Sequence, residues 1–487
     1  MALPRRGFQR ISKMSGCGQL AALRCWDNGA ILTTLYDAMA SRVYASALLA
    51  AALLASFDAS AQIGKRFPSE KKIVKDPVTG TMLTFLTSKP HGDSKIYPTH
   101  PQWTADGKWV VFRSNLVRDN GHTEAMAVNE ASGDIVQVSD GGYQGMLNLA
   151  RKSMKLYFMR KGDSGLQVVE VDLARVFADS AAGKMGAAAS YQRVAGTVPD
   201  KLEGGGDMAL DADEEWVYFR VGKNEAARHL AAGTRIEPNF GPRNMGSGPN
   251  GIARMNVRSG EIRHVVSVPF QIGHIQANLY NPGEIVFCWE TGGKSPQRTW
   301  TVMADGSGLR KLYPEAAYEW VTHEAVIGKD EVAMAIMGHR QITGAAAAVD
   351  GPATDVGGAN PGQDMAWGDA GTREKPTGLA IVNLRTRQMQ IAGQTPAGSG
   401  LWHVHGSNDG RWAVGDDFAR SVWLIDRRTR EMMLLTTGHK TTAADHTHPT
   451  FNADGTKIEI QSAMLSADGR TMNIVVVPVP EEWLKRK

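Results

Sequence analysis

The sequence predicts an all-β protein built as a seven-bladed β-propeller, and two observations carry this prediction. First, a turn followed by an alternating strand recurs seven times along the chain. The turns lie near Asp106, Lys152, Asp213, Pro282, Asp330, Asp409 and Asp454. Second, long amphipathic helical patterns are almost absent. Seven repeats of four short strands are typical of a propeller, in which small sheets surround a central channel.

Each repeat begins with a turn and a strand whose side chains alternate in polarity. The clearest examples are 104–114 (TADGKWVVFRS) and 452–462 (NADGTKIEIQS), where Asp-Gly accepts the positive φ of a tight turn. Partner strands that end in a second turn follow, such as 125–139 (AMAVNEASGDIVQVS) and 422–435 (VWLIDRRTREMMLL). We expect residues 472–480 (MNIVVVPVP) to complete the last blade and residues 82–87 (MLTFLT) to form the outer strand of that blade. Segments 224–250 and 340–376 are rich in Gly, Ala and Asn, and are predicted to be long loops at the rim.

The N-terminal segment 1–61 has the pattern of an upstream extension followed by a signal peptide. Arg42 precedes an apolar run over 43–57, and the run ends at Ala59-Ser60-Ala61, an A-x-A cleavage signal. Met39, just ahead of Arg42, is a candidate for the true start. We therefore expect export to the bacterial periplasm, cleavage after Ala61 and no membrane span in the mature chain (62–487).

Charge and cysteine content restrict the class of partner. Residues 1–61 hold six of the 54 Lys and Arg residues and three of the 50 Asp and Glu residues, so the formal net charge falls from +4 to +1 without them. A nearly neutral chain with no basic tract argues against nucleic acid as a partner. Cys288 is the one cysteine of the mature chain, so no intramolecular disulfide is expected.

Histidines recur just before the turn and strand of the last four repeats. They are His274, His323, His403, His405, His446 and His448. Equivalent positions in successive blades meet around the central channel, so several of these imidazoles are expected at one place. Such a group suits Mn²⁺, Zn²⁺, Fe²⁺ or Ni²⁺. A purely structural role is the alternative, because Thr-His-Pro at His100 repeats Thr-His-Pro at His448 with no evident metal.

Five stretches resemble the oligogalacturonate lyases, polysaccharide lyase family 22. They are KDPVTGTMLTFLT, GHIQANLYNPGEIVFCWE, RTWTVMADGSGLRKL, THEAVIGKDEVAMA and HTHPTFNADG. The resemblance implies a seven-bladed propeller that holds a divalent metal, typically manganese, through three histidines and a glutamine. It also implies β-elimination of small, acidic galacturonides, with a further histidine as the base.

Carried over by position, the resemblance makes His274 the catalytic base. His323, His403 and one of His446 and His448 become metal ligands, with His448 the better aligned. Arg298 matches a family arginine and is expected to bind a sugar carboxylate bidentately.

Two positions depart from the family pattern. Gly400 stands where the ligand glutamine is expected (or Trp402, if His405 is the true match for the ligand in that blade), and Gly251 replaces a family arginine. Two other functions stay open. One is a non-catalytic periplasmic propeller similar to TolB that binds a protein or peptide, and the other is a lyase for another uronate glycan such as ulvan or rhamnogalacturonan.

The predicted export has a direct test. Protein secreted by a bacterial host is expected to begin at Gln62, because signal peptidase cleaves after the A-x-A motif. N-terminal sequencing of the secreted protein checks this, and cytoplasmic retention of a chain that starts at Met39 would contradict it.

Overall fold

The computed structural model describes residues 62–119, 122–238, 245–291, 295–315, 320–337, 378–394 and 400–486. The predicted extension and signal peptide (1–61) and the predicted loop 340–376 lie outside these residues, so both stay predictions. None of the described helices is long and apolar enough to span a membrane.

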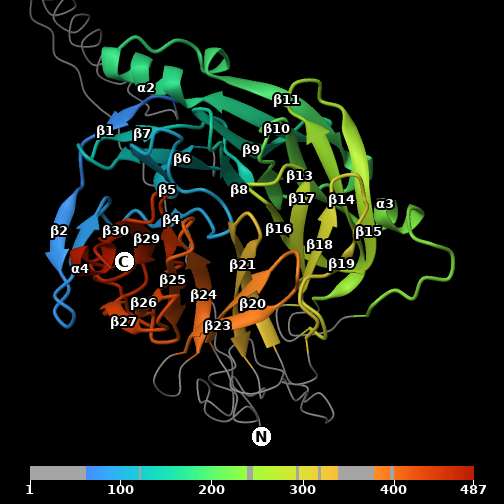
Figure 1. The fold of residues 1–487 in the computed structure, drawn as a ribbon. Helices are drawn as coiled ribbons and strands as arrows, with labels where there is room; N and C mark the ends of the chain where they lie inside the picture. Colours follow the sequence, from blue (N-terminus) through green and yellow to red (C-terminus); the bar gives the residue numbers. More distant parts are fainter. Residues whose placement is uncertain are drawn as a thin grey trace, which may run out of the picture. The chain divides into compact units, whose positions relative to one another are not determined.

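Seven small antiparallel sheets form a ring, which confirms the seven-bladed β-propeller (Figure 1). Blade one contains β4 (Asp93–Lys95), β5 (Trp109–Asp119), β6 (His122–Asn129), β7 (Ile135–Gln137) and β1 (Arg66–Phe67). Blade two contains β8 (Gln144–Leu149), β9 (Lys155–Gly162), β10 (Gly165–Asp172) and β11 (Gln192–Pro199). Blade three contains β12 (Met208–Leu210), β13 (Trp216–Val221), β14 (Ser247–Asn256) and β15 (Ile262–Phe270).

The remaining blades repeat this order. Blade four contains β16 (Ile272–Ala277), β17 (Glu284–Trp289), β18 (Thr299–Met303) and β19 (Arg310–Lys311). Blade five contains β20 (Trp320–Gly328), β21 (Glu331–Met337), β22 (Gly378–Asn383) and β23 (Met389–Gly393). Blade six contains β24 (Leu401–Gly406), β25 (Trp412–Asp417), β26 (Val422–Asp426) and β27 (Met432–Thr436). Blade seven contains β28 (Thr450–Phe451), β29 (Lys457–Ser462), β30 (Asn473–Pro478), β3 (Met82–Phe85) and β2 (Lys72–Lys75). Each predicted turn joins the first two strands of its blade.

Blade seven joins the two ends of the described chain. Phe85 of β3 pairs with Val475 of β30, as predicted for the 82–87 segment. The prediction that this segment is the outermost strand is wrong, because β2 pairs with the other edge of β3. The Asp76 carboxylate explains the extra strand: it accepts hydrogen bonds from the backbone N–H groups of Val78 (2.8 Å) and Thr79 (3.0 Å) and so closes a hairpin.

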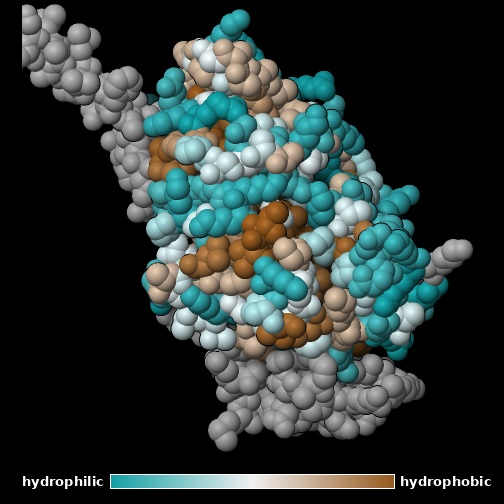
Figure 2. Space-filling view, turned by 90° about the vertical axis from the view of Figure 1, so that its left-hand side faces the viewer, coloured by the Kyte–Doolittle hydropathy of each residue, from teal (hydrophilic) through white to brown (hydrophobic). Residues whose placement is uncertain are grey.

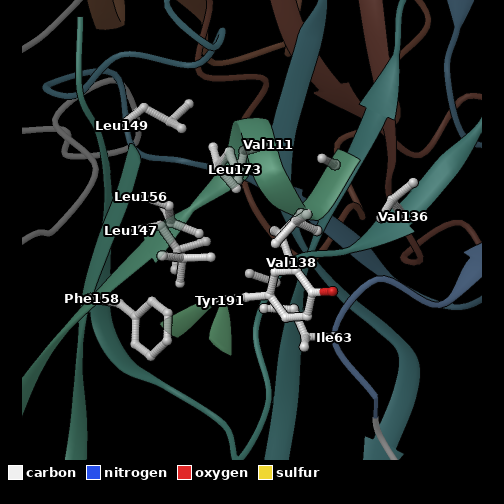
Figure 3. Close-up of a cluster of buried hydrophobic side chains, with 14 of the residues drawn as sticks. Ile63, Val111, Val136, Val138, Leu147, Leu149, Leu156, Phe158, Leu173 and Tyr191 are labelled. Atoms are coloured by element: carbon white, nitrogen blue, oxygen red, sulfur yellow. The ribbon is translucent and has the colours of Figure 1, made fainter. Parts of the chain in front are cut away.

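Seven clusters of buried apolar side chains lie at the junctions between neighbouring blades. The cluster between blades one and two includes Ile63, Val111, Leu147 and Tyr191 (Figure 3). Burial of apolar surface contributes about 25 cal/mol per Å². Because every cluster draws on two sheets, each blade is stabilised by its neighbours, and the ring needs all seven junctions.

Among the described residues, three short α-helices and two 3₁₀ turns lie outside the strands, and the sequence did not predict them. The helices are α2 (Leu173–Ala182), α3 (Lys223–Arg228) and α4 (Glu481–Leu484), and the turns cover Ala188–Ser190 and Asp200–Leu202. The Asp172 side chain caps α2 by accepting from the Arg175 N–H, and Phe177 stacks on Trp109 at 4.0 Å between ring centroids. The prediction of a loop over 224–250 is wrong at both ends, because α3 covers its start and β14 covers its end. The Ala-rich stretch NEAAR favours the helix.

The outer edge of blade seven leaves several apolar side chains in solvent. Ile73, Val78 and Met82 are 65%, 71% and 48% exposed. The side of the molecule that carries β1 and β2 shows apolar surface among polar side chains (Figure 2). Phe85, in contrast, is fully buried between blades six and seven.

Closure of the ring by β3 predicts a large cost for truncating Phe85. Phe85→Ala is expected to lower the free energy of unfolding by about 3–5 kcal/mol, because it leaves a cavity at a blade junction. Val78→Ala, on the exposed hairpin, is the matched control and should change it by less than about 0.5 kcal/mol. Urea unfolding of the 62–487 chain measures both, and equal effects would contradict the closure role of β3.

Candidate active site

Four of the predicted histidines come together from four consecutive blades. His274 lies on β16, His323 on β20, His403 on β24, and His448 just before β28. The ring centroids of His323 and His403 are 4.2 Å apart, those of His403 and His448 are 3.8 Å apart, and those of His274 and His323 are 5.9 Å apart. The convergence expected from the repeat is therefore present. The roles of these residues as ligands or base stay predictions.

Three of these histidines lie in equivalent irregularities of the first strand of their blade. The register shifts between Gly273 and Gln276 in β16, between Val321 and Glu324 in β20, and between Leu401 and Val404 in β24. A bulge bends the strand and re-aims a side chain, and bulges are frequent beside active sites. His274 and His448 also have positive φ values of 48° and 53°, which non-glycine residues seldom adopt. The backbone is therefore irregular at the positions that direct these histidine side chains toward one another.

The Asp416 carboxylate, on β25, connects the histidines of blades six and seven. It is fully buried and accepts hydrogen bonds from the backbone N–H of His403 (2.7 Å) and from the N–H and hydroxyl of Thr447 (3.0 Å each). His403 Nδ1 and His446 Nδ1 each lie 3.3 Å from its oxygens. Burial alone would raise the pKa of Asp416, but His403 and these hydrogen bonds hold it well below its usual range. Asp416 therefore stays ionised and fixes both segments.

Hydrogen bonds to Nδ1 set the tautomers of two histidines. His323 Nδ1 lies 2.9 Å from the backbone carbonyl of Trp402, and His403 Nδ1 faces the Asp416 carboxylate. Because both partners only accept, Nδ1 carries the proton and Nε2 keeps its lone pair. Burial, reinforced by neighbouring histidines, lowers the pKa of His323 well below its ordinary value and lowers the pKa of His403 to about 4. Both rings are neutral at pH 7, the form that binds metal ions.

His274 has a different environment, built from buried charges. Its Nδ1 lies 3.0 Å from Glu324 Oε1, and Arg298 Nε donates to Glu324 Oε2 at 3.0 Å. Glu290 Oε2 lies 3.7 Å from His274 Nε2 and 3.6 Å from Arg298 Nη2. Burial opposes protonation of His274, but the Glu324 carboxylate outweighs it and raises the pKa of His274. Cys288 is buried in β17 with its sulfur within 4.8 Å of donor atoms of His274 and Glu324, and burial raises the pKa of its thiol.

Tyr97, which the sequence did not single out, lies among the four histidines. It follows β4 of blade one, and its ring centroid is 5.1 Å from that of His274 and 5.2 Å from that of His448. His403 and His323 lie at 6.0 Å and 6.5 Å. Burial, then the Glu324 charge, raises the pKa of Tyr97 well above its usual value. Nothing in the sequence distinguishes Tyr97 from the other tyrosines, because its position depends on closure of the ring.

The two remaining predicted histidines differ in their surroundings. The His446 ring lies 5.1 Å from that of His403, so both members of the His446/His448 pair reach the cluster, with His448 closer. His405 lines a cavity of about 270 Å³ together with Tyr280 and Phe451. The four clustered histidines are absent from the described lining of that cavity. His403 is therefore the blade-six histidine that belongs to the cluster.

Comparison with solved structures places two oligogalacturonate lyases on this fold. One, in complex with manganese, superimposes with a TM-score of 0.64, 16% sequence identity, and coverage of 87% of this chain and 100% of the other. The second, from Vibrio parahaemolyticus, gives a TM-score of 0.63 with the same identity and coverage. At such identity the likeness shows the shared fold alone.

Other comparisons add no functional argument. A TolB protein from Agrobacterium tumefaciens matches with a TM-score of 0.35 and 12% identity over 66% of this chain and 87% of the other, too low to support one. No protein-family model and no curated protein matches the sequence.

The donor atoms of the cluster fit a divalent transition metal. His448 Nε2 and His446 Nδ1 are buried, and neither forms a well-aligned hydrogen bond within the described part of the chain. Each faces a carboxylate instead: His448 Nε2 lies 3.4 Å from Asp445 Oδ1, and His446 Nδ1 lies 3.3 Å from Asp416 Oδ2. A buried polar atom that forms no hydrogen bond costs up to about 1–3 kcal/mol, which coordination to a cation would offset. Donor atoms of His403, Asp416 and His446 all lie within 4.8 Å of one another. Imidazoles with the Asp416 and Asp445 carboxylates nearby suit Mn²⁺, Zn²⁺, Fe²⁺ or Ni²⁺.

The role of Asp416 in orienting the ligands predicts the effect of its amide. Asp416→Asn places an NH₂ group against backbone donors, so it is expected to weaken Mn²⁺ binding by about 10–100-fold, the usual effect of disrupting the residues behind a ligand. Asp417→Asn, one residue along β25, is the matched control and should retain the affinity. Isothermal titration of each variant with Mn²⁺ measures this, and equal affinities would show that Asp416 does not orient the site.

Proposed function

We propose that this protein is a metal-dependent lyase that cleaves uronate-containing oligosaccharides, with oligogalacturonides as the first candidate, by β-elimination. The observation that carries the proposal is the convergence of His323, His403 and His448 beside His274, whose Nδ1 is held by Glu324. The shared fold with two oligogalacturonate lyases supports the proposal, and so do the sequence stretches that resemble that family.

The metal would be held by His323 and His403 through Nε2, and by His448, with His446 as the alternative ligand from blade seven. Manganese is the first candidate, because it is the metal named for one of the similar structures. When bound, such a cation neutralises the uronate carboxylate and stabilises the enediolate charge that develops on proton removal. The chain has Gly400 at the family's glutamine position, so it supplies one side-chain donor fewer there.

His274 is the base that removes the proton next to the carboxylate. Glu324 accepts from Nδ1, which leaves the Nε2 lone pair to take that proton, and the same carboxylate stabilises the imidazolium that forms. Only neutral His274 can accept a proton, and its pKa is raised. Activity should therefore increase as the pH rises through that pKa.

Arg298 lies beside His274 and Glu324, and these surroundings favour a role other than the predicted binding of a sugar carboxylate. Its side chain is 5% exposed, and its guanidinium faces Glu324 and Glu290. A sugar carboxylate would have to displace these buried partners to be bound bidentately. We therefore assign Arg298 a positioning role: it fixes the His274 ring through Glu324 and through direct contact, with Nη2 3.3 Å from His274 Nδ1.

The proposal predicts distinct effects for three histidines. With di- and trigalacturonate, each elimination produces an unsaturated uronate that absorbs ultraviolet light. His274→Ala should retain metal and lower kcat by about 10²–10⁴-fold, the usual contribution of a general base. His448→Ala should lose bound metal and activity together. His405→Ala, in the cavity that His405 shares with Tyr280, is the control that should retain both. Elemental analysis and the absorbance assay measure these outcomes.

Other substrates and the non-catalytic alternative are outcomes of the same experiment. Absorbance with ulvan or rhamnogalacturonan oligomers, but not with galacturonides, would keep the mechanism and change the substrate. If carefully prepared protein holds no stoichiometric metal and no uronate is cleaved, the site is not a lyase centre and a TolB-like binding propeller is the better description.

A further inference from the structure

β-Elimination needs a second proton transfer that the histidines do not supply. As the glycosidic C–O bond breaks, the leaving oxygen becomes an alkoxide of a sugar alcohol, which is a poor leaving group unless it is protonated. We propose that Tyr97 is the catalytic acid that protonates this leaving oxygen. This inference rests on the proposed lyase function and adds a residue to the same site.

Tyr97 approaches the site from blade one, which supplies neither the base nor the proposed ligands. Its ring lies 5.1 Å from that of His274 at an interplanar angle of 60°, and 5.2 Å from that of His448 at 80°. A sugar that offers its carboxylate to the histidines of blades five to seven and its acidic C–H to His274 is therefore also beside Tyr97. Acid and base reach the substrate from different blades.

The backbone of Tyr97 is fixed, while its hydroxyl group is free. Its carbonyl accepts hydrogen bonds from the His100 N–H (3.0 Å) and from Gln102 Nε2 (3.2 Å). The side chain is partly exposed, and no described residue forms a hydrogen bond with the hydroxyl. A phenol ordinarily titrates near about pH 10, so it holds its proton at neutral pH. A fixed, protonated and unpartnered donor beside the base matches what the leaving oxygen requires.

One other free hydroxyl in this region is less suitable. Thr322, next to His323, has a buried Oγ1 without a hydrogen-bond partner in the described chain. It is 3% exposed, so it offers no surface to a substrate, and an aliphatic alcohol is a much weaker acid than a phenol. The nearby Glu324 carboxylate is already occupied by His274 and Arg298.

The proposed step balances in protons and electrons. The C5–H bond breaks, its proton goes to His274 Nε2, and its electron pair forms the C4=C5 double bond. The C4–O bond breaks, its electron pair stays on the leaving oxygen, and that oxygen takes the proton of the Tyr97 hydroxyl. The products are an unsaturated uronate and an alcohol. The proton on His274 then returns to the Tyr97 oxygen, directly or through a water molecule, and no water is consumed.

Tyr97→Phe tests this assignment, because it keeps the ring among the histidines and removes only the hydroxyl. We expect kcat on digalacturonate to fall by about 10²–10⁴-fold with unchanged metal content. We expect a galacturonide with fluoride as the C4 leaving group to react at close to the unaltered rate, because fluoride departs without a proton. His274→Ala should slow both substrates, since both require removal of the C5 proton. Tyr280→Phe, in the cavity that Tyr280 shares with His405, is the control and should leave both rates unchanged.

The outcomes separate the failure of this inference from that of the proposed function. If the unaltered protein cleaves no uronate, the lyase proposal fails and the role of Tyr97 fails with it. If the protein is active and Tyr97→Phe slows both substrates equally, loses metal or slows neither, Tyr97 is not the acid. Should Tyr97→Phe misfold, para-fluorophenylalanine at position 97, which replaces the hydroxyl by an atom without a proton, should slow digalacturonate but not the fluoride substrate, and equal effects on the two would overturn the assignment.

Discussion

Closure of the ring through pairing of β3 with β30 is the constraint on which the candidate site depends. Tyr97 stands near the start of the described chain and His448 near its end, yet their rings are 5.2 Å apart. They meet only because blade seven joins strands from both ends and packs against blade one through the cluster that contains Leu86 and Ile474. A site assembled from five blades exists only in the closed ring.

Within the closed ring, two devices aim the side chains. Bulges in β16, β20 and β24 place one histidine per blade, and the ionised Asp416 carboxylate ties His403 to the segment that carries His448. A bulge sets the direction of a side chain, whereas Asp416 sets the position of one blade's histidine relative to the next. The bulges interrupt regular strand pairing, and the buried Asp416 carboxylate loses its hydration. Such energetic costs are typical of functional positions.

Much of this arrangement could be predicted from the sequence, because it is periodic. The seven turns gave the blade count, and histidines before the same turn in successive repeats indicated convergence. Tyr97, Asp416 and Glu324 could not be identified in this way, since each acts on a residue of another blade, and such contacts leave no trace in local patterning. The short helix α2 was missed for a related reason: it lies between two strands of one repeat and is too short for its periodicity to stand out.

The pairing of β3 with β30 also has a consequence for the order in which the chain is made. Ribosomes produce β3 near the start of the described chain, but its partner β30 is the last of the described strands to be made. Until then β3 presents an unpaired edge with Leu83 and Phe85 uncovered, and unpaired edges invite association with other chains. Contacts between the ends of a chain also form slowly. Newborn protein therefore passes through a vulnerable interval whose length is set by translation, and a holdase chaperone that covers β3 would shorten the exposure.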